Sequence, residues 1–399
     1  MKKILFILPF TFFLYALYAQ DTDPYLKAVA AISKENYARA VQELSAVMDK
    51  NTNDIRIIIK RAECYYELGE YRSSINDCLK AEKIKNNIGS YLLSKSYAEL
   101  GMEDSALFYL SNHLKSPYKF PESTIKLDPA FVDLEFTSGW KQVWKNDWYD
   151  EYEVLIAELK YLIKQEEYME ALDLADENLD KYPHGHQIQG LRGKIFLTLG
   201  DYNTAVSAYS KAIQIKNDQA EYYIERSEAY SRTEKYDKAV LDLDWAIRLM
   251  PENFALYLKR NDLHIKRNDY SKALRDIDFY HTYFPNDSQV QYQYGMTYYY
   301  QGSYLKALEW FNKCIVTNPT KAEYFIGRGN TYLRTKTYKY ALYDYSMALD
   351  LEPDNPTTYL NKGIVRLHLN DTKGACYDWE KARYYGSFEA EEFLNTHCR

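Results

Sequence analysis

The chain has 399 residues, of which 46% are hydrophobic and 27% are charged, and this composition excludes a disordered or fibrous protein. Its formal net charge is −7, and no run of lysine and arginine forms a basic stripe. Nucleic-acid binding needs such a stripe to neutralise phosphates, so the sequence argues against that function.

The first residues have the pattern of an export signal. Lys2 and Lys3 precede an apolar run at 4–17, and the small residues Ala16 and Ala19 lie near its end. The run is shorter than the ~20 apolar residues that a membrane helix needs. We therefore expect a cleavable signal peptide at 1–19 and no stable membrane span after cleavage. The alternative is retention of the segment as an anchor. The mature protein is expected to be periplasmic or secreted.

Residues 20–116 follow the expected signal and are predicted to hold about three units of two helices each. Tyr37 and Ala40 mark the second helix of the first unit, and Tyr71 marks that of the second. Gly101 marks the turn of the third. The three units are placed at 21–54, 55–88 and 89–116.

Residues 117–151 break this organisation and form an insert outside the repeats. Trp140, Trp144 and Trp148 are spaced by four, so a helix would place them on roughly one face. One interpretation of this Trp-rich helix is an aromatic platform for a ligand. The other is packing of the insert onto the flanking repeats, which we favour because aromatic stripes at helical spacing mostly serve cores.

From residue 152 to 388 the repeat is strict. A tyrosine three residues before an alanine returns every 34 residues, and apolar residues at spacings of three and four mark two amphipathic helices per unit. Such a period indicates about seven stacked copies of one unit, with a long surface for partners. We expect residues 389–399 to form a helix that caps the exposed end. The repeated residues are Tyr168, Tyr202, Tyr236, Tyr270, Tyr304 and Tyr338, with Ala171, Ala205, Ala239, Ala273, Ala307, Ala341 and Ala375.

The clearest copy, residues 322–355, carries eight anchors: Phe325, Gly329, Tyr332, Tyr338, Ala341, Tyr345, Ala348 and Pro353. Their spacing resembles the tetratricopeptide repeat (TPR), a unit of 34 residues. The resemblance implies an all-α fold, a right-handed superhelical solenoid of TPR helix-turn-helix hairpins. Small residues such as Gly329 and Ala341 are expected where helices approach closely. A residue larger than alanine at 341 should cost roughly 1–3 kcal/mol by overpacking.

In TPR proteins the first helices line a concave groove that binds a protein or peptide. In this chain the corresponding positions change from mixed charges in earlier units to apolar and aromatic residues near the C-terminus. An exposed patch of that kind often marks a protein contact, and the alternative is that the terminal helix covers it. The groove residues implied by the resemblance are Tyr292, Met296, Tyr299, Tyr300, Asn330, Leu333, Arg334, Asn361, Ile364 and Leu367.

Some members of the family hold the C-terminal carboxylate of a peptide with lysines and paired asparagines. Asn330 and Asn361 match the asparagine pair in position. However, Ile326 occupies the expected lysine position, and Gln289 and Glu323 are not basic. The clamp is therefore incomplete, which argues against binding of chaperone tails.

The five cysteines are an odd number, so at least one is unpaired in an exported protein. Cys314 falls at a small, buried position of its repeat. A disulfide between Cys376 and Cys398 would join the terminal helix to the last hairpin, as the oxidising destination permits. The alternative is that every thiol is free.

The sequence contains no recognisable catalytic or cofactor-binding motif. It has no glycine-rich phosphate loop, no nucleophile elbow and no metal-binding helix motif. His184 and His186 flank a glycine without an evident third ligand, so no metal is expected. We predict a non-enzymatic interaction scaffold of the bacterial cell envelope that binds a protein or peptide. The alternatives are a structural subunit of an envelope or secretion assembly, and an unrecognised enzyme or metal-binding protein.

Overall fold

The computed structural model describes residues 23–48 and 53–398. In those residues the regular structure consists of 23 α-helices and one 3-10 turn, and no strand occurs among them. The predicted all-α class of repeated helical hairpins is therefore confirmed. The predicted signal peptide at 1–19 lies outside the described residues.

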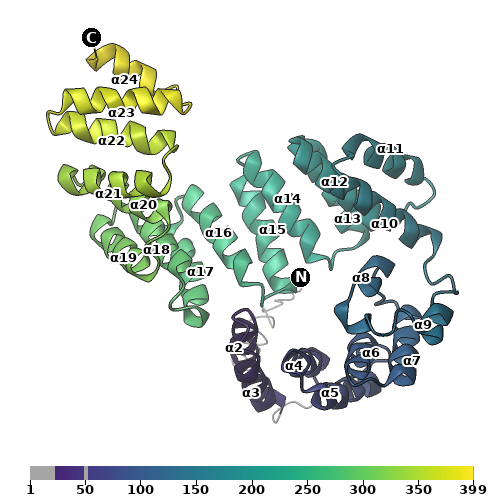
Figure 1. The fold of residues 1–399 in the computed structure, drawn as a ribbon. Helices are drawn as coiled ribbons and strands as arrows, with labels where there is room; N and C mark the ends of the chain where they lie inside the picture. Colours follow the sequence, from purple (N-terminus) through teal and green to yellow (C-terminus); the bar gives the residue numbers. More distant parts are fainter. Residues whose placement is uncertain (1–22, 49–52, 399) are drawn as a thin grey trace, which may run out of the picture. The chain divides into compact units, whose positions relative to one another are not determined.

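The chain divides into two compact units, residues 1–191 and 192–399, and the boundary falls within α12 (His186–Leu199). In the first unit, α2 to α7 form three hairpins, α8 to α9 belong to the insert, and α10 and α11 form a fourth hairpin (Figure 1). The helices of this unit are α2 (Asp23–Ile32), α3 (Tyr37–Met48), α4 (Ile55–Glu67), α5 (Tyr71–Ile84), α6 (Ser90–Glu99), α7 (Glu103–Leu114), α8 (Glu122–Lys126), η1 (Pro129–Phe131), α9 (Ser138–Val143), α10 (Glu151–Lys164) and α11 (Tyr168–Asn178).

The second unit is a regular stack of hairpins that ends in a single helix, coloured yellow in Figure 1. Its helices after α12 are α13 (Tyr202–Ile215), α14 (Ala220–Arg232), α15 (Tyr236–Leu249), α16 (Phe254–Lys266), α17 (Tyr270–Tyr283), α18 (Ser288–Tyr300), α19 (Tyr304–Thr317), α20 (Ala322–Arg334), α21 (Tyr338–Leu351), α22 (Pro356–His368), α23 (Thr372–Tyr384) and α24 (Ala390–His397).

Glycines in the first helices allow aromatic rings of the second helices to pack against the backbone. A Cβ atom built on Gly329 would lie 2.9 Å from the Tyr345 ring, and one on Gly363 would lie 2.4 Å from Trp379. Both rings are fully buried, so neither can move aside easily. The predicted close approach at Gly329 is confirmed.

One residue with positive φ separates the two helices of each regular hairpin. Gly302 (φ +81°), Lys336 (φ +58°) and Asn370 (φ +63°) occupy this turn in successive units, and Gly101 (φ +67°) occupies it in the third. The left-handed conformation lets the following amide return to the helix, as Thr337 does by donating to the Tyr332 carbonyl at 2.8 Å. This residue gives every hairpin a common register.

A ladder of arginine–aspartate pairs, which sequence analysis did not predict, joins the helices within and between hairpins. Arg328 donates two hydrogen bonds to the Asp344 carboxylate, at 2.8 and 2.7 Å, and a third to Asn312 of the preceding hairpin at 2.7 Å. The same arrangement recurs at Arg61 with Asp77 and Ser45, Arg226 with Asp242 and Ser210, and Arg260 with Asp276 and Asp244.

One hairpin replaces this pair with two aromatic residues. Tyr294 and Trp310 occupy the arginine and aspartate positions, and their rings stack at 4.1 Å between centroids. The Tyr294 hydroxyl donates to Asp278 of the preceding hairpin. It thus makes the inter-hairpin contact that the guanidinium makes elsewhere.

The insert packs onto the third hairpin. Trp140 is buried in α9, and Trp144 and Trp148 pack against the same cluster, which includes Leu110 of α7 and Phe131 of η1. The prediction of one helix carrying all three tryptophans is wrong, because α9 ends at Val143. Trp148 instead folds back, and its indole N–H donates to the Val143 carbonyl at 2.9 Å. This arrangement agrees with the packing interpretation of the three rings.

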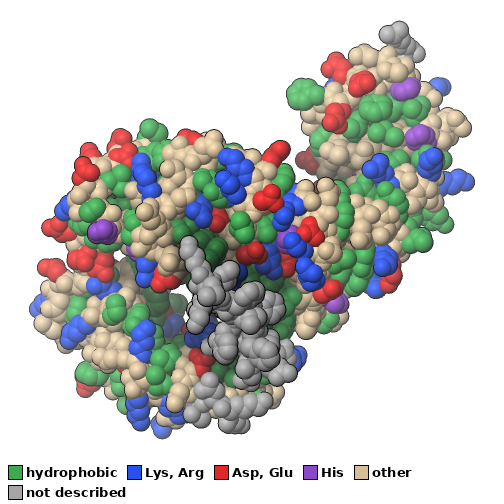
Figure 2. Space-filling view, turned by 180° about the vertical axis from the view of Figure 1, so that it is seen from behind, with side chains coloured by type: hydrophobic (Ala, Val, Ile, Leu, Met, Phe, Trp, Pro, Cys, Tyr) green, Lys and Arg blue, Asp and Glu red, His purple; other side chains and the backbone are tan. Residues whose placement is uncertain are grey.

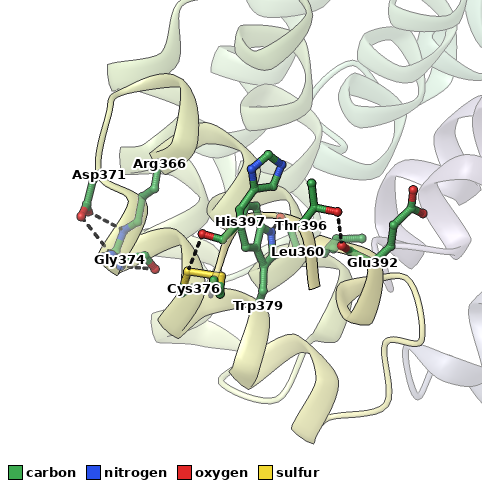
Figure 3. The surroundings of a disulfide bond; sticks show 10 residues. Leu360, Arg366, Asp371, Gly374, Cys376, Trp379, Glu392, Thr396 and His397 are labelled. Atoms are coloured by element: carbon green, nitrogen blue, oxygen red, sulfur yellow. Dashed lines mark hydrogen bonds and ion pairs between the residues drawn. A yellow bond between two sulfur atoms is a disulfide. The ribbon is translucent and has the colours of Figure 1, made fainter. Parts of the chain in front are cut away.

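The last helix, α24, continues the register of the first helices. Phe393 follows Tyr359 by the same 34-residue period and stacks on Trp379 at 5.1 Å. Cys376 and Cys398 form a disulfide with a Cα–Cα distance of 5.7 Å (Figure 3). Cys376 Sγ also lies 3.8 Å from the His397 carbonyl, a contact rather than a hydrogen bond because a disulfide sulfur carries no proton.

The three other cysteines, Cys64, Cys78 and Cys314, are free and buried. The expectation of a core position for Cys314 is confirmed.

Candidate peptide-binding surface

The first helices of successive hairpins in the second unit line one continuous surface. α16 contacts α18, α18 contacts α20, and α20 contacts α22. We call this surface, from α14 to α22, the first-helix face. All ten predicted groove residues lie on α18, α20 or α22.

Tyr292 and Met296 pack into the core that their hairpin shares with the next one. The Tyr292 ring lies 5.2 Å from the Tyr324 ring and 5.8 Å from the Phe311 ring, and Met296 packs against the same cluster. Burial raises the pKa of Tyr292, and Glu323 raises it further. These two side chains form the floor of the first-helix face rather than its most accessible part.

Tyr299, Tyr300 and Arg334 form the accessible part. The Tyr300 side chain is 52% exposed and its ring lies 5.4 Å from that of Tyr299. Burial raises the pKa of Tyr299, while the charge and a hydrogen bond of Arg334 oppose this rise. Two tyrosine rings beside a guanidinium can accept an apolar or aromatic side chain and also bind a carboxylate or carbonyl.

The two asparagines of the expected clamp are bonded to each other. The Asn361 amide donates to Asn330 Oδ1 at 3.2 Å, and the Tyr345 hydroxyl donates to the same oxygen at 2.7 Å. Ile326, at the lysine position, is half-buried and packs beside Phe325. The pair therefore links α20 to α22, and the lysine that would complete the clamp is replaced by an apolar side chain.

The predicted residues nearest the C-terminus share a core with the terminal helix. Ile364 and Leu367 pack against the same cluster as Phe393 and Leu394 of α24. Leu333 packs against the neighbouring cluster around Tyr345. These three side chains of the predicted groove are half-buried.

The α14–α18 part of the first-helix face carries charges of both signs, and two of its carboxyl groups have raised pKa values. The protein surrounding Asp262 raises its pKa to about 6, although Lys266 and a hydrogen bond from Gln293 oppose this effect. Burial likewise raises the pKa of Glu225, and Lys194 opposes it. Acidic and basic side chains are also interspersed on the side of the protein drawn in Figure 2.

The described residues contain no group of three or more His, Cys, Asp or Glu side chains that could hold a metal ion. Within the same ranges, no helix is long and apolar enough to cross a membrane.

Sequence analysis missed the bonded pair Asn330–Asn361 and the role of Tyr345 in fixing it. The signal was weak, because contacts between neighbouring units depend on stacking geometry that the period alone does not contain. It also missed a polar cluster around Asp128 in the first unit, which is described below.

A stack of two-helix hairpins in a common register, with its first helices lining one face, defines a helical-repeat solenoid protein. Residues 193–234 match the family described as TPR repeat, and residues 288–321 match the tetratricopeptide repeat. Together with the fold, these matches show that the chain contains tetratricopeptide repeats.

The chain is also similar to known proteins over parts of its length. It is 25% identical over 223 residues to DnaJ homolog subfamily C member 3 of Bos taurus, covering 54% of this chain and 40% of that protein. It is 25% identical over 202 residues to Hsp70-Hsp90 organizing protein 3 of Arabidopsis thaliana, covering 51% of this chain and 32% of that protein. The matches thus span less than half of either relative.

Among solved structures, a tetratricopeptide repeat protein from Parabacteroides merdae superposes with a TM-score of 0.55 at 19% identity. The match covers 62% of this chain and 99% of that chain. This likeness concerns the fold.

Proposed function

We propose that the protein is a non-enzymatic scaffold of the bacterial cell envelope that binds a protein or peptide segment on its first-helix face. The observation that carries the proposal is the accessible group of Tyr299, Tyr300 and Arg334 on a surface formed by several first helices. Tyrosine and arginine are the residues that most often dominate protein interfaces. Proteins built from TPR hairpins generally mediate protein–protein interaction, and the fold typically serves as a non-enzymatic scaffold.

The envelope location rests on the signal-like sequence at 1–19. N-terminal sequencing of the protein recovered from fractionated bacteria tests it. Cleavage after Ala19 and recovery outside the cytoplasm are expected, whereas an intact N-terminus in the cytoplasmic fraction would remove this part of the proposal.

Binding is tested with peptides selected from a displayed random library on the purified protein. The selected peptide is titrated by fluorescence anisotropy against wild type, Tyr300→Ala and Tyr343→Ala. Tyr343 is a matched control because it is 58% exposed but lies on a second helix. We expect Tyr300→Ala to weaken binding at least tenfold and Tyr343→Ala to leave it unchanged. Equal affinities for all three proteins would refute binding at the first-helix face.

The second candidate function is that of a structural subunit in an envelope or secretion assembly. It is favoured by aromatic side chains that are more than half exposed on the second helices of the last two hairpins: Tyr340, Tyr343, Tyr377 and Tyr384. In that case Tyr343→Ala would impair assembly while Tyr300→Ala would not.

A further inference from the structure

The first-helix surface of the third hairpin is already occupied by the chain's own insert. The left-handed turn residues set the register: Tyr91 lies as far before Gly101 as Tyr292 lies before Gly302. By the same register, Lys95 corresponds to Met296. Tyr91 and Lys95 of α6 therefore occupy positions equivalent to two of the predicted groove residues of the second unit.

The carboxylate of Asp128, in the insert, is bound by both of these side chains. Its Oδ2 atom accepts a hydrogen bond from the Tyr91 hydroxyl at 2.7 Å and lies 3.1 Å from Lys95 Nζ. Lys95 Nζ also lies 4.6 Å from the centroid of the Tyr66 ring, a cation–π distance. The Asp128 and Lys95 side chains are only 13% and 20% exposed, so this ion pair is shielded from water and salt.

An aromatic side chain of the same short turn packs close to the Asp128 carboxylate. Phe131, the last residue of η1, is fully buried and makes an edge contact with Tyr91 at 5.9 Å between centroids. Phe120 contacts the Tyr91 ring at 4.8 Å, and its backbone N–H donates to His113 Nε2 at 3.0 Å. The His113 ring of α7 also lies 4.8 Å from the Tyr91 ring, so Tyr91 is enclosed by side chains of the insert and of α7.

Two apolar side chains that flank the turn, Ile125 and Leu134, are also buried in the core cluster of the third hairpin. Leu127 is 81% exposed and Phe136 is 80% exposed, and the regular element between them is the three-residue turn η1. A segment with little regular structure, held by one buried acid and a few buried apolar side chains, has the contact pattern of a short peptide bound to a receptor.

We propose that the α6 surface formed by Tyr91 and Lys95 is a second binding site, specific for a peptide segment with a carboxylate three residues before an aromatic ring. The Asp128–Phe131 turn occupies this site in cis. A partner segment of the same chemistry binds there by displacing the turn. The site belongs to the first unit, so it stands whether or not the first-helix face of the second unit binds a peptide.

The cis segment competes at a high effective concentration, because short tethers give local concentrations of order 1 mM. A free peptide is therefore expected to bind weakly to the wild-type protein and more tightly once the cis contacts are removed. The probe is a fluorescein-labelled peptide of residues 121–137, and its control carries Asp128→Ala and Phe131→Ala.

Fluorescence anisotropy measures binding of both peptides to three full-length proteins. These are the wild type, Asp128→Ala/Phe131→Ala, and that variant with Lys95→Met, which copies Met296. We expect the double variant to bind the probe at least tenfold more tightly than the wild type, and Lys95→Met to abolish the gain. A double variant with native helicity but no saturable binding would overturn the proposal, as would equal binding of the control peptide.

Amide hydrogen exchange of the wild-type protein gives a test that does not depend on folding of the variant. With ~1 mM unlabelled probe, residues 122–134 are expected to exchange faster because the turn is displaced. Unchanged exchange at that concentration, or the same acceleration by the control peptide, would also overturn the proposal.

Discussion

Removing Arg328 tests whether the arginine–aspartate ladder holds the hairpins together. Arg328→Ala leaves the Asp344 carboxylate, whose side chain is 1% exposed, without its two hydrogen bonds, and it also removes the bond to Asn312. Breaking a buried ion pair from one side typically costs 3–5 kcal/mol, so we expect a loss of about 3–5 kcal/mol in unfolding free energy. Urea unfolding followed by circular dichroism measures this loss.

The pH dependence of the loss gives a further check. Burial already raises the pKa of Asp344 despite the opposing guanidinium, and removal of Arg328 should raise it more. Because the folded Arg328→Ala variant binds a proton at Asp344 more readily than the unfolded chain does, its stability rises as the pH falls. The difference in unfolding free energy between this variant and the wild type should therefore shrink at acidic pH.

A double variant provides the matched control. Arg328→Tyr/Asp344→Trp copies Tyr294 and Trp310, whose rings stack at 4.1 Å. Since replacing both members of a buried pair by well-packed apolar groups is often neutral, the double variant should be closer in stability to wild type than Arg328→Ala. A loss below about 1 kcal/mol for Arg328→Ala at neutral pH would refute the reasoning.

Three further predictions follow from other features. Gly302→Ala should destabilise the protein by about 1–2 kcal/mol, because an added Cβ meets no atom within 4 Å and only the φ of +81° opposes it. Lys336→Gly should raise the urea concentration at the unfolding midpoint, because Lys336 has a φ of +58° that glycine adopts without strain. Midpoint shifts of the same sign for both variants would contradict this account. Burial raises the pKa of Asp378 to about 6. The unfolding free energy of the wild type should therefore fall by up to about 3 kcal/mol relative to that of Asp378→Asn as the pH rises from about 4 to 7. A difference that does not change with pH would be inconsistent with the raised pKa. Cys398→Ser should cost about 3 kcal/mol and speed hydrogen exchange in α24, and unchanged exchange would show that the disulfide does not hold this helix.

The sequence predicted the hairpins well because their packing depends on local size and spacing. Tyr338 begins α21, Ala341 is fully buried, and Gly329 meets the Tyr345 ring. Each of these contacts lies within one repeat, so a single 34-residue period contains the necessary information.

The insert was harder to predict because it has no second copy. Spacing by four suggested one helix for its tryptophans, but Trp148 donates to the Val143 carbonyl and the chain leaves the helix. The salt bridge from Lys95 to Asp128 joins residues far apart in sequence, and no periodic pattern marks it.

The candidate site was predicted in position but not in exposure. Its residues lie on the expected helices, yet Tyr292 packs on Tyr324 and Ile364 shares a core with Phe393. These contacts cross from one repeat to the next, so the exposure of each side chain depends on residues one period away. The arginine–aspartate ladder could have been found from the sequence, since each arginine precedes its aspartate by 16 residues.

Site-specific photo-crosslinking tests the central claim most directly. A photoreactive phenylalanine analogue is placed at Tyr300 in one protein and at Tyr343 in another, and each is irradiated with the selected peptide. The account predicts a crosslink from position 300 on the first-helix face and none from position 343. Crosslinking from position 343 alone would contradict binding on the first-helix face.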